Sequence, residues 1–349
     1  MAGGEIDTKR LTRPARQKSK LLYFTPIFLF SKGYPILKVV SYLIALSVAF
    51  AFFGCDDQYQ TNQNKKEIIA SKSGELVFGD KKVTYFIEGE GNPCFVCADG
   101  IIQANCLSEK LKKQLQFIFL EQRHSTYYGE QKDYSDISMD TIVDDIEILR
   151  KKFEYDKIYV LGHSINGLIA IEYARKYPQN TTGVIMINTP PHFHNDYMDI
   201  VSRNWNTNAS EERKMVYESN KERLKKTNVD SLPEIERTFM QYKANVPMYW
   251  YDPLYDISSV FRGFRENTSG WNHFYTLMRD YNITRSEINV PIFLSLGSYD
   301  FMVPQSLWDD YIDKFPTLSV KRFIKSGHFP HVEERELFDD QLLSWIKDK

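Results

Sequence analysis

The chain contains 349 residues, of which 42% are hydrophobic and 14% aromatic, enough for one large core or for a core with an inserted subdomain. Its formal net charge of −2 argues against a nucleic-acid-binding protein, because such proteins carry a strongly basic surface. The charge is uneven. Residues 1–54 hold eight Lys or Arg and two acidic residues, an excess of six positive charges, so the remainder carries about −8.

A hydrophobic segment lies near the N-terminus. Residues 39–53 are fifteen apolar or small residues, too few for a typical membrane span but typical of the apolar region of a signal peptide. The Gly-Cys pair that follows resembles the lipobox of bacterial lipoproteins, in which the cysteine is lipidated and becomes the new N-terminus. We therefore expect residues 1–54 to be a signal segment and Cys55 to carry a lipid anchor at the bacterial cell envelope, facing the periplasm or the exterior. The alternative is an uncleaved single-span anchor over residues 34–54.

Residues 55–72 are polar and predict a tether, after which strand and helix patterns alternate. Residues 75–91 have the pattern of a hairpin that turns at Gly79 and Asp80. Six short apolar runs follow, at residues 94–100, 117–123, 158–164, 183–189, 291–297 and 318–324. Several are almost continuously apolar, as strands buried on both faces of a parallel sheet should be.

Helical patterns at residues 139–153 and 165–177 lie between these runs, and a last one at residues 333–347 follows them. The alternation predicts an α/β fold with a mainly parallel, doubly wound sheet of eight strands, and with binding at the carboxyl ends of the strands.

One long segment interrupts the alternation. Residues 192–288 contain charged, helix-compatible stretches and an aromatic cluster, but no strong strand pattern. Since this is too long for a loop in a compact domain, we expect an inserted helical cap. The catalytic core then comprises residues 73–191 and 289–349.

Three cysteines lie beyond the tether. Cys94 and Cys97 form a C-x-x-C inside a strand-like run, where residues three apart point to opposite faces. No second pair and no suitably spaced histidines accompany them, so the pattern disfavours a zinc site and predicts buried thiols. A Cys97–Cys106 disulfide is the alternative in an oxidising compartment.

The stretch "VLGHSINGLIAIEYARKYP" (160–178) has the pattern of a buried strand, a sharp turn and a helix. Ser164 would stand at the apex of the turn, and Gly162 and Gly167 would let the helix pack back against the strand, as in a nucleophile elbow. The helix N-terminus would also bring backbone N–H groups to the serine oxygen. Asn166 stands where a further tight-turn glycine would be expected, but asparagine tolerates left-handed and turn conformations. We therefore predict that Ser164 is a nucleophile.

Two further side chains complete the pattern. Asp300 follows the strand run "PIFLSLG", and His328, in "KSGHFPHVEE", follows the last strand run. Both would lie at the same edge of the sheet as Ser164. A serine nucleophile needs a base to take its proton, and the imidazole needs a carboxylate to fix its tautomer. The order Ser, Asp, His is that of the α/β-hydrolases.

Here the chain resembles the α/β-hydrolase superfamily over residues 75–349, and within it the proline iminopeptidase-like branch. The similar segments are "EQRHST" (121–126), "GHSING" (162–167), "GSYDFMVP" (297–304) and "GHFPHVEE" (327–334). The resemblance implies a lidded serine hydrolase that uses no metal or organic cofactor and acts on a small molecule or a short peptide. In it Ser164 is the nucleophile, His328 the general base and then acid, and Asp300 the residue that orients His328.

The loop that helps form the oxyanion hole in this superfamily is altered. The family's H-G-x-P-G corresponds here to "DGIIQAN" (99–105), in which only Gly100 is retained. If Asp99 and Gly100 overlay the family's His-Gly, the resemblance implies that the backbone N–H groups of Ile101 and Ile165 are the donors. A backbone donor tolerates a change of side chain.

The predicted cap offers an aromatic cluster that has two interpretations. Its members either line a substrate pocket or form the core of the lid, and they are Tyr249, Trp250, Tyr251, Trp271 and Phe274. In aminopeptidase-type relatives, acidic cap residues bind the free α-amine of the substrate. Candidates for this role are Glu212, Glu218, Glu234 and Glu236, although a solvated helix face would carry the same residues.

Several polar residues near the motifs have structural interpretations. We expect His163 to pack or hydrogen-bond beside the serine, and His331 to be a bystander of His328. Arg123 and Glu121 suggest a salt-bridge network at a strand end.

The sequence thus favours a serine hydrolase that forms an acyl-enzyme on Ser164, with release of N-terminal proline as the specific expectation. A carboxylesterase of small or aromatic esters is the first alternative. The second is a non-catalytic, hydrolase-like binding protein. Asn166 and the altered oxyanion loop are the features that favour this alternative.

Overall fold

The computed structural model describes residues 73–78, 81–97, 99–125, 133–194, 196–265, 268–279, 281–284 and 287–348. The predicted signal segment, Cys55 and the predicted tether lie outside these residues. Within the described part of the chain, no helix has both the length and the apolar character needed to cross a bilayer.

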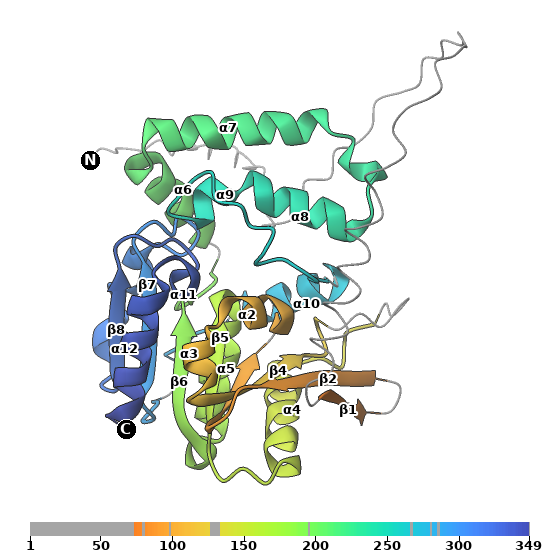
Figure 1. Ribbon diagram of the computed structural model, residues 1–349, viewed down its shortest axis with the longest axis vertical. Coiled ribbons are helices and arrows are strands. Elements are labelled where there is room, and N and C mark those ends of the chain that lie inside the picture. The colour runs from red at the N-terminus through yellow and green to blue at the C-terminus, as the bar shows by residue number, and fades with distance from the viewer. Residues whose placement is uncertain are drawn as a thin grey trace, which may run out of the picture. The chain divides into compact units, whose positions relative to one another are not determined.

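Eight strands form one sheet in the order β1-β2-β4-β3-β5-β6-β7-β8. They are β1 (Ser73–Phe78), β2 (Lys81–Glu88), β3 (Asn92–Cys97), β4 (Leu115–Glu121), β5 (Ile158–His163), β6 (Thr181–Ile187), β7 (Ile292–Gly297) and β8 (Leu318–Phe323). The pairs β1–β2 and β2–β4 are antiparallel, and all other neighbours are parallel. The predicted fold class is therefore confirmed (Figure 1).

Apolar side chains on both faces explain why the central strands sit inside the molecule. Every residue of β5 and of β7 is buried. On one face the sheet packs against α4 (Met139–Lys152) and α5 (Gly167–Lys176), and on the other against α3 (Glu109–Lys112) and α12 (Arg335–Lys347). Two hydrophobic cores thus enclose the sheet, as parallel strands require.

Local signals set where the helices begin. At the start of α4, the Ser138 side chain accepts from the Thr141 N–H at 3.2 Å, while the Thr141 hydroxyl accepts from the Ser138 N–H at 2.8 Å. This reciprocal capping satisfies backbone donors that the first turn leaves open.

The three cysteines of the core are free, buried thiols. Cys94 and Cys97 lie on β3 and belong to different hydrophobic cores, so they point to opposite faces as predicted. The alternative Cys97–Cys106 disulfide is not formed.

The chain between β6 and β7 is helical where it is described. It contains α6 (Tyr197–Asn208), α7 (Glu211–Lys226), α8 (Glu234–Ala244), α9 (Val246–Tyr249) and α10 (Thr268–Met278), which we call the helical insertion. Helices α6 to α9 lie beyond the carboxyl ends of the central strands (Figure 1). A buried arginine joins two of them, since Arg213 of α7 donates to the carbonyl oxygens of Pro247 (2.8 Å) and Trp250 (2.7 Å).

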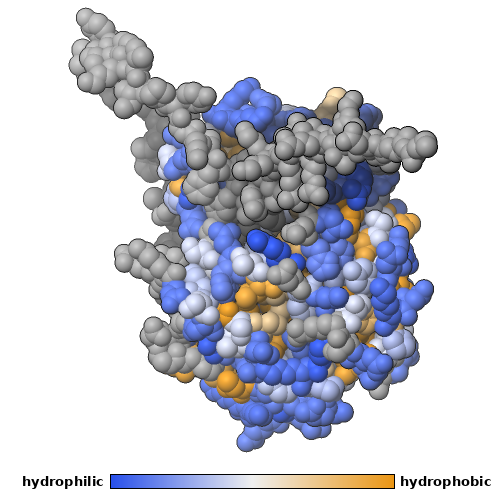
Figure 2. Space-filling model, turned by 180° about the vertical axis from the view of Figure 1, so that it is seen from behind, coloured by the Kyte–Doolittle hydropathy of each residue, from blue (hydrophilic) through white to orange (hydrophobic). Residues whose placement is uncertain are grey.

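The remaining short elements border the strand ends. They are α2 (Gly100–Cys106), α11 (Pro330–Glu333) and the 3₁₀ turns η1 (Ser164–Asn166), η2 (Pro178–Asn180), η3 (Val229–Ser231), η4 (Gln305–Trp308) and η5 (Ile312–Lys314). The face seen in Figure 2 is largely hydrophilic, with scattered hydrophobic patches. Among the described residues, the most exposed large hydrophobic side chains lie on separate segments, as Met215 on α7 and Leu254 beyond α9 illustrate.

Candidate active site

Ser164 occupies a strained turn between β5 and α5. Its φ of 56° lies in the left-handed region, which a non-glycine residue enters at an energetic cost. A Cβ at Gly162 would lie 2.4 Å from the Asn166 carbonyl oxygen, and a Cβ at Gly167 would lie 1.9 Å from Thr189 Oγ1. Both glycines are therefore needed for helix and strand to approach this closely, and the turn has the geometry of a nucleophile elbow. Ser164 itself is half-buried.

Asn166 has a different role from the one expected. Its φ of −69° and ψ of −15° are ordinary right-handed values in a 3₁₀ turn, so of the two conformations expected to favour asparagine the turn is observed and the left-handed one is not. Instead its Nδ2 donates to Asp99 Oδ2 at 3.0 Å, which joins the helix after Ser164 to the loop after β3. The left-handed residue of the turn is Ser164.

Asp300 and His328 are brought together from the ends of β7 and β8. His328 Nδ1 donates to Asp300 Oδ2 at 2.6 Å, and both side chains are almost completely buried. The other carboxylate oxygen of Asp300 accepts the N–H groups of Met302 (2.9 Å) and Val303 (2.8 Å). These bonds fix the orientation of the carboxylate, and with Nδ1 as the donor to Asp300, His328 Nε2 is the ring nitrogen left for another partner.

The structure adds Asn188, which sequence reasoning missed. It follows β6, is fully buried, and has a left-handed φ of 45°. Its Nδ2 donates to Asp300 Oδ2 at 2.7 Å and to the Gly327 carbonyl oxygen at 3.1 Å. Asn188 thus ties the carboxylate to the loop that carries His328. An asparagine directly after a buried strand was the available signal.

His163 packs and hydrogen-bonds, as expected. Its Nδ1 accepts from Gln103 Nε2 at 3.2 Å, and its Nε2 donates to the His328 carbonyl oxygen at 2.8 Å. Burial, together with the neighbouring imidazoles of His328 and His331, holds the pKa of His163 well below its ordinary value. A neutral His163 can therefore brace the backbone of His328. Gln103 is a second residue that the sequence did not indicate.

The loop of His328 is held from the insertion as well. The His328 N–H donates to the Tyr249 carbonyl oxygen, and the two rings lie 5.4 Å apart. Glu333 accepts the N–H groups of Tyr251 (2.6 Å) and Gly327 (2.8 Å), so one carboxylate joins the insertion to this loop. Burial raises the pKa of Glu333 to about 8.

Ser164 follows β5 and His328 follows β8, two strands that β6 and β7 separate in the sheet, and the two residues are not hydrogen-bonded. Both residues are described, and no hydrogen bond joins Ser164 Oγ to the imidazole. Contacts of this kind are often long before substrate binds. The structure therefore brings Asp300 and His328 into direct contact and leaves the serine in its elbow nearby.

The two expected backbone donors differ. Ile165 lies in the first turn after Ser164, where an N–H has no partner within the helix. The N–H of Ile101, in contrast, hydrogen-bonds to the Glu121 carboxylate. The carboxyl at the end of β4 is therefore the partner of the expected Ile101 donor in this structure.

Two carboxyl groups lie close together beside the elbow. Loss of solvent raises the pKa of Asp99 to about 7, against the lowering effect of its hydrogen bond from Asn166. Loss of solvent and the nearby Asp99 raise the pKa of Glu121 to about 8. Both groups can therefore change charge near neutral pH, at the position where the superfamily has its oxyanion loop.

Most of the predicted pocket aromatics belong to hydrophobic cores. Trp250 is 2% exposed and stacks between Tyr255 and Phe329, with ring centroids 4.0 and 4.6 Å away. Trp271 is buried, with its ring 4.9 Å from that of His124. Of the three expected pocket residues, Tyr249 has its ring against the His328 imidazole, while Trp250 packs on Phe329 of the same loop.

The other cap candidates differ in how far their side chains are exposed to solvent. Phe274 is fully buried, and Tyr251 is partly exposed. Three of the acidic candidates for amine binding, Glu212, Glu218 and Glu236, are exposed on helices α7 and α8, and Glu234 is half-buried.

The other polar residues that the sequence singled out are Arg123, His331 and His124. Arg123 forms a bidentate pair with Asp145 of α4, with both contacts at 2.6 Å, so it does form a salt bridge, with a partner that the sequence did not indicate. His331 is buried, and among the described residues neither of its ring nitrogens has a hydrogen-bond partner. Burial lowers the pKa of His331 to about 3, and that of His124 likewise.

Comparisons with known proteins agree with this fold. The family model for the alpha/beta hydrolase fold matches residues 100–335. The chain therefore belongs to the α/β-hydrolase family.

The chain is also similar in sequence to individual proteins. AB hydrolase superfamily protein YclE of Bacillus subtilis is 28% identical over 270 residues, which cover 76% of this chain and 95% of that protein. A proline iminopeptidase of Flavobacterium johnsoniae is 39% identical, but over only 79 residues, 22% of this chain and 27% of that enzyme.

Solved structures show the same fold at low identity. VinJ superposes with a TM-score of 0.61 at 14% identity, covering 80% of this chain and 99% of that one. Proline iminopeptidase of Mycobacterium smegmatis superposes with a TM-score of 0.58 at 13% identity, covering 79% and 98%.

Proposed function

We propose that this protein is a serine hydrolase that cleaves a peptide or ester bond through an acyl-enzyme on Ser164. The observation that carries the proposal is the 2.6 Å hydrogen bond between Asp300 and His328, at the sheet edge where Ser164 occupies its strained turn. This bond orients the imidazole so that Nε2 can act as a base.

The proposed reaction has two steps. Ser164 Oγ attacks the substrate carbonyl carbon while its proton passes to His328 Nε2, and the Asp300 carboxylate stabilises the imidazolium. The imidazolium then gives its proton to the leaving amine or alcohol. In the second step water attacks the acyl-enzyme by the same route, which releases the acid and restores Ser164.

The negative oxygen formed in each step needs hydrogen-bond donors. The N–H of Ile165 is the first proposed donor. The N–H of Ile101 can serve only if substrate binding releases it from Glu121. A hydrolase-like binding protein is the alternative that this occupied donor favours, and the substrate experiment below distinguishes the two.

We further propose that the substrate has a free amine beside the scissile carbonyl, with N-terminal proline as the specific acyl residue. The partial identity to proteins named proline iminopeptidase supports this. The Asp99 and Glu121 carboxyls lie beside the elbow and, when ionised, can accept a substrate ammonium group.

The experiment compares four chromogenic substrates: a prolyl amide and a simple acyl ester, each with and without a free α-amine. Turnover that is fastest for the prolyl amide with a free α-amine, and that is absent in Ser164→Ala, supports the aminopeptidase proposal. Faster turnover of blocked compounds supports a carboxylesterase instead. No serine-dependent turnover of any substrate contradicts the hydrolase proposal and favours the binding protein.

The cellular location is a separate part of the proposal. The lipobox-like sequence supports a lipid anchor on Cys55 at the bacterial cell envelope. Intact mass of protein extracted from membranes tests it. A mature chain that begins at a lipidated Cys55 is expected, and an unmodified N-terminus upstream of it would contradict the anchor.

A further inference from the structure

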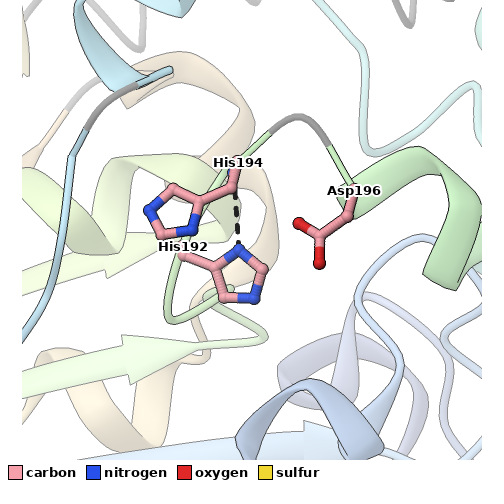
Figure 3. Close-up of side chains that lie close together, drawn as sticks. All are labelled: His192, His194 and Asp196. Atoms are coloured by element: carbon pink, nitrogen blue, oxygen red, sulfur yellow. Dashed lines mark hydrogen bonds between the residues drawn. The ribbon is translucent and has the colours of Figure 1, made fainter. Parts of the chain in front are cut away.

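Two imidazoles and a carboxylate lie together where the chain leaves β6 and enters the helical insertion. They belong to His192, His194 and Asp196, and one potential ligand atom from each lies within 4.8 Å of those of the other two. Figure 3 shows the Asp196 carboxylate directed toward the two rings. None of the three residues takes part in the proposed chemistry of Ser164.

The position of this cluster is the neck of the insertion. His192 forms an isolated antiparallel bridge with Asn282, which pairs a residue near the start of the insertion with one near its end. The His192 ring also stacks on Tyr311, with centroids 5.6 Å apart, and His192 is only 6% exposed. Asp196 immediately precedes α6. The cluster therefore joins the core to the first helix of the insertion.

The donor set indicates the kind of ion. Two imidazole nitrogens and one carboxylate oxygen suit zinc and other divalent transition metals, whereas calcium and magnesium prefer oxygen ligands alone. Sites with three protein ligands usually complete their coordination with water.

The geometry needs only a small adjustment. Zinc–ligand bonds of about 2.0–2.2 Å allow two ligands to be at most about 4.4 Å apart. The widest separation here, up to 4.8 Å, must therefore shrink. His192 is held in place by its bridge and stacking contacts, while His194 is half-buried and Asp196 exposed, so these two side chains can move toward it.

Binding would displace little existing structure. The one hydrogen bond within the cluster runs from the His194 N–H to His192 Nδ1 at 3.4 Å, which is long for such a bond. No hydrogen bond involves His192 Nε2 or the His194 ring nitrogens among the described residues. A cation therefore competes with only one weak contact.

We propose that His192, His194 and Asp196 bind one divalent transition metal of the zinc class, and that the bound ion braces the neck of the helical insertion. The ion ties the buried His192 to the start of α6 through the two adjustable ligands. The site is separate from acyl transfer, so the ion acts on the stability of the insertion.

The test measures binding of zinc to the full-length protein, free of any polyhistidine tag, after removal of bound metals with a chelator. Competition with a chromogenic chelator gives the stoichiometry and affinity, and thermal unfolding gives the stabilisation. We expect one zinc ion per chain and a higher Tm in its presence, because an ion that binds only the folded state stabilises it.

Single substitutions test which residues bind the zinc ion. His194→Gln and Asp196→Asn change exposed or half-buried side chains, so they should fold, and each should weaken zinc binding at least about tenfold and abolish the rise in Tm. Asp199→Asn, which changes an exposed residue in the first turn of α6, is the matched control and should bind as the parent does. Zinc binding that is absent from the parent, or equal in all the variants, would overturn the proposal. Because zinc binding and Tm are measured without any substrate of Ser164, their outcome is independent of the proposed hydrolase function.

Discussion

At the scale of single residues, the candidate site depends on side chains that hold others in place. Asp300 receives four hydrogen bonds, from His328, Asn188 and two backbone N–H groups. His328 is held through its ring by Asp300, through its N–H by Tyr249 and through its carbonyl oxygen by His163. In the proposed mechanism this preorganises the acid–base pair, which avoids the cost of ordering it during the reaction.

The first prediction concerns Asn188→Gly. Glycine tolerates the left-handed backbone at this position, so the change removes the amide that holds Asp300 without adding strain. We expect kcat to fall by about tenfold or more with little change in KM, because orientation of the general base contributes mainly in the transition state. Steady-state kinetics measure this.

Glu154→Gly is the matched control, since Glu154 is also left-handed but is exposed at the end of α4. It should retain the parent kcat. Equal loss in both variants would show that a backbone effect, and not the bond to Asp300, explains the result.

The second prediction concerns the charge of Glu121. Its raised pKa of about 8 means that it is mostly protonated at neutral pH and becomes negative as the pH rises above 8. A negative charge beside the Ile101 donor opposes the developing oxyanion. We therefore expect kcat/KM for an uncharged ester to fall above pH 8 in the parent, and to fall less in Glu121→Gln.

The measurement is the pH profile of both proteins, with Glu90→Gln on the exposed turn before β3 as control. Parallel alkaline limbs in the parent and in Glu121→Gln would contradict a role for this carboxyl.

At the scale of elements, the closeness of α5 to the sheet sets the elbow. Gly167→Ala would put a methyl group into the buried Thr189 side chain, 1.9 Å from its hydroxyl oxygen. We expect a loss of about 1–3 kcal/mol in the free energy of unfolding, because the helix must move away from the strand. Urea unfolding measures this loss, and hydrolytic activity should fall with it because Ser164 shifts.

Ala174→Gly in the same helix is the control. It should cost about 1 kcal/mol through helix propensity but leave the elbow, and hence activity, intact. If Gly167→Ala retained full activity, the close helix–strand contact would not be what positions Ser164.

The elements themselves were largely predictable, and their polar contacts were not. Continuous apolar runs identified the strands because burial on both faces demands them, as in β5 and β7. The bond from Asn166 to Asp99 spans 67 residues, and that from Asn188 to Asp300 spans 112. Such pairs depend on how strand ends meet in space, which no local pattern encodes. The same holds for Trp250, whose burial between Tyr255 and Phe329 could not be distinguished from pocket lining by composition.

At the scale of the whole molecule, the helical insertion is bonded to the core at the candidate site. The Phe301 N–H donates to the Met248 carbonyl oxygen at 3.0 Å, and the Tyr251 N–H donates to Glu333 at 2.6 Å. These contacts join α9 and its following residues to the loops of Asp300 and His328. The insertion is therefore part of what forms the site.

This coupling predicts a single unfolding transition for insertion and core. Calorimetry should give a calorimetric enthalpy equal to the van't Hoff enthalpy, since neither part keeps its contacts without the other. Two resolved transitions would contradict it and would mean that the insertion unfolds independently.

The central claim is that Ser164 is an activated nucleophile served by His328. Labelling of the folded protein with a fluorophosphonate probe tests it most directly, beside Ser164→Ala, His328→Ala and the control Ser298→Ala, which changes an exposed serine. We predict labelling of the parent and of Ser298→Ala, and its loss in the other two variants. A folded parent that remains unlabelled, or labelling that persists in Ser164→Ala, would contradict the account.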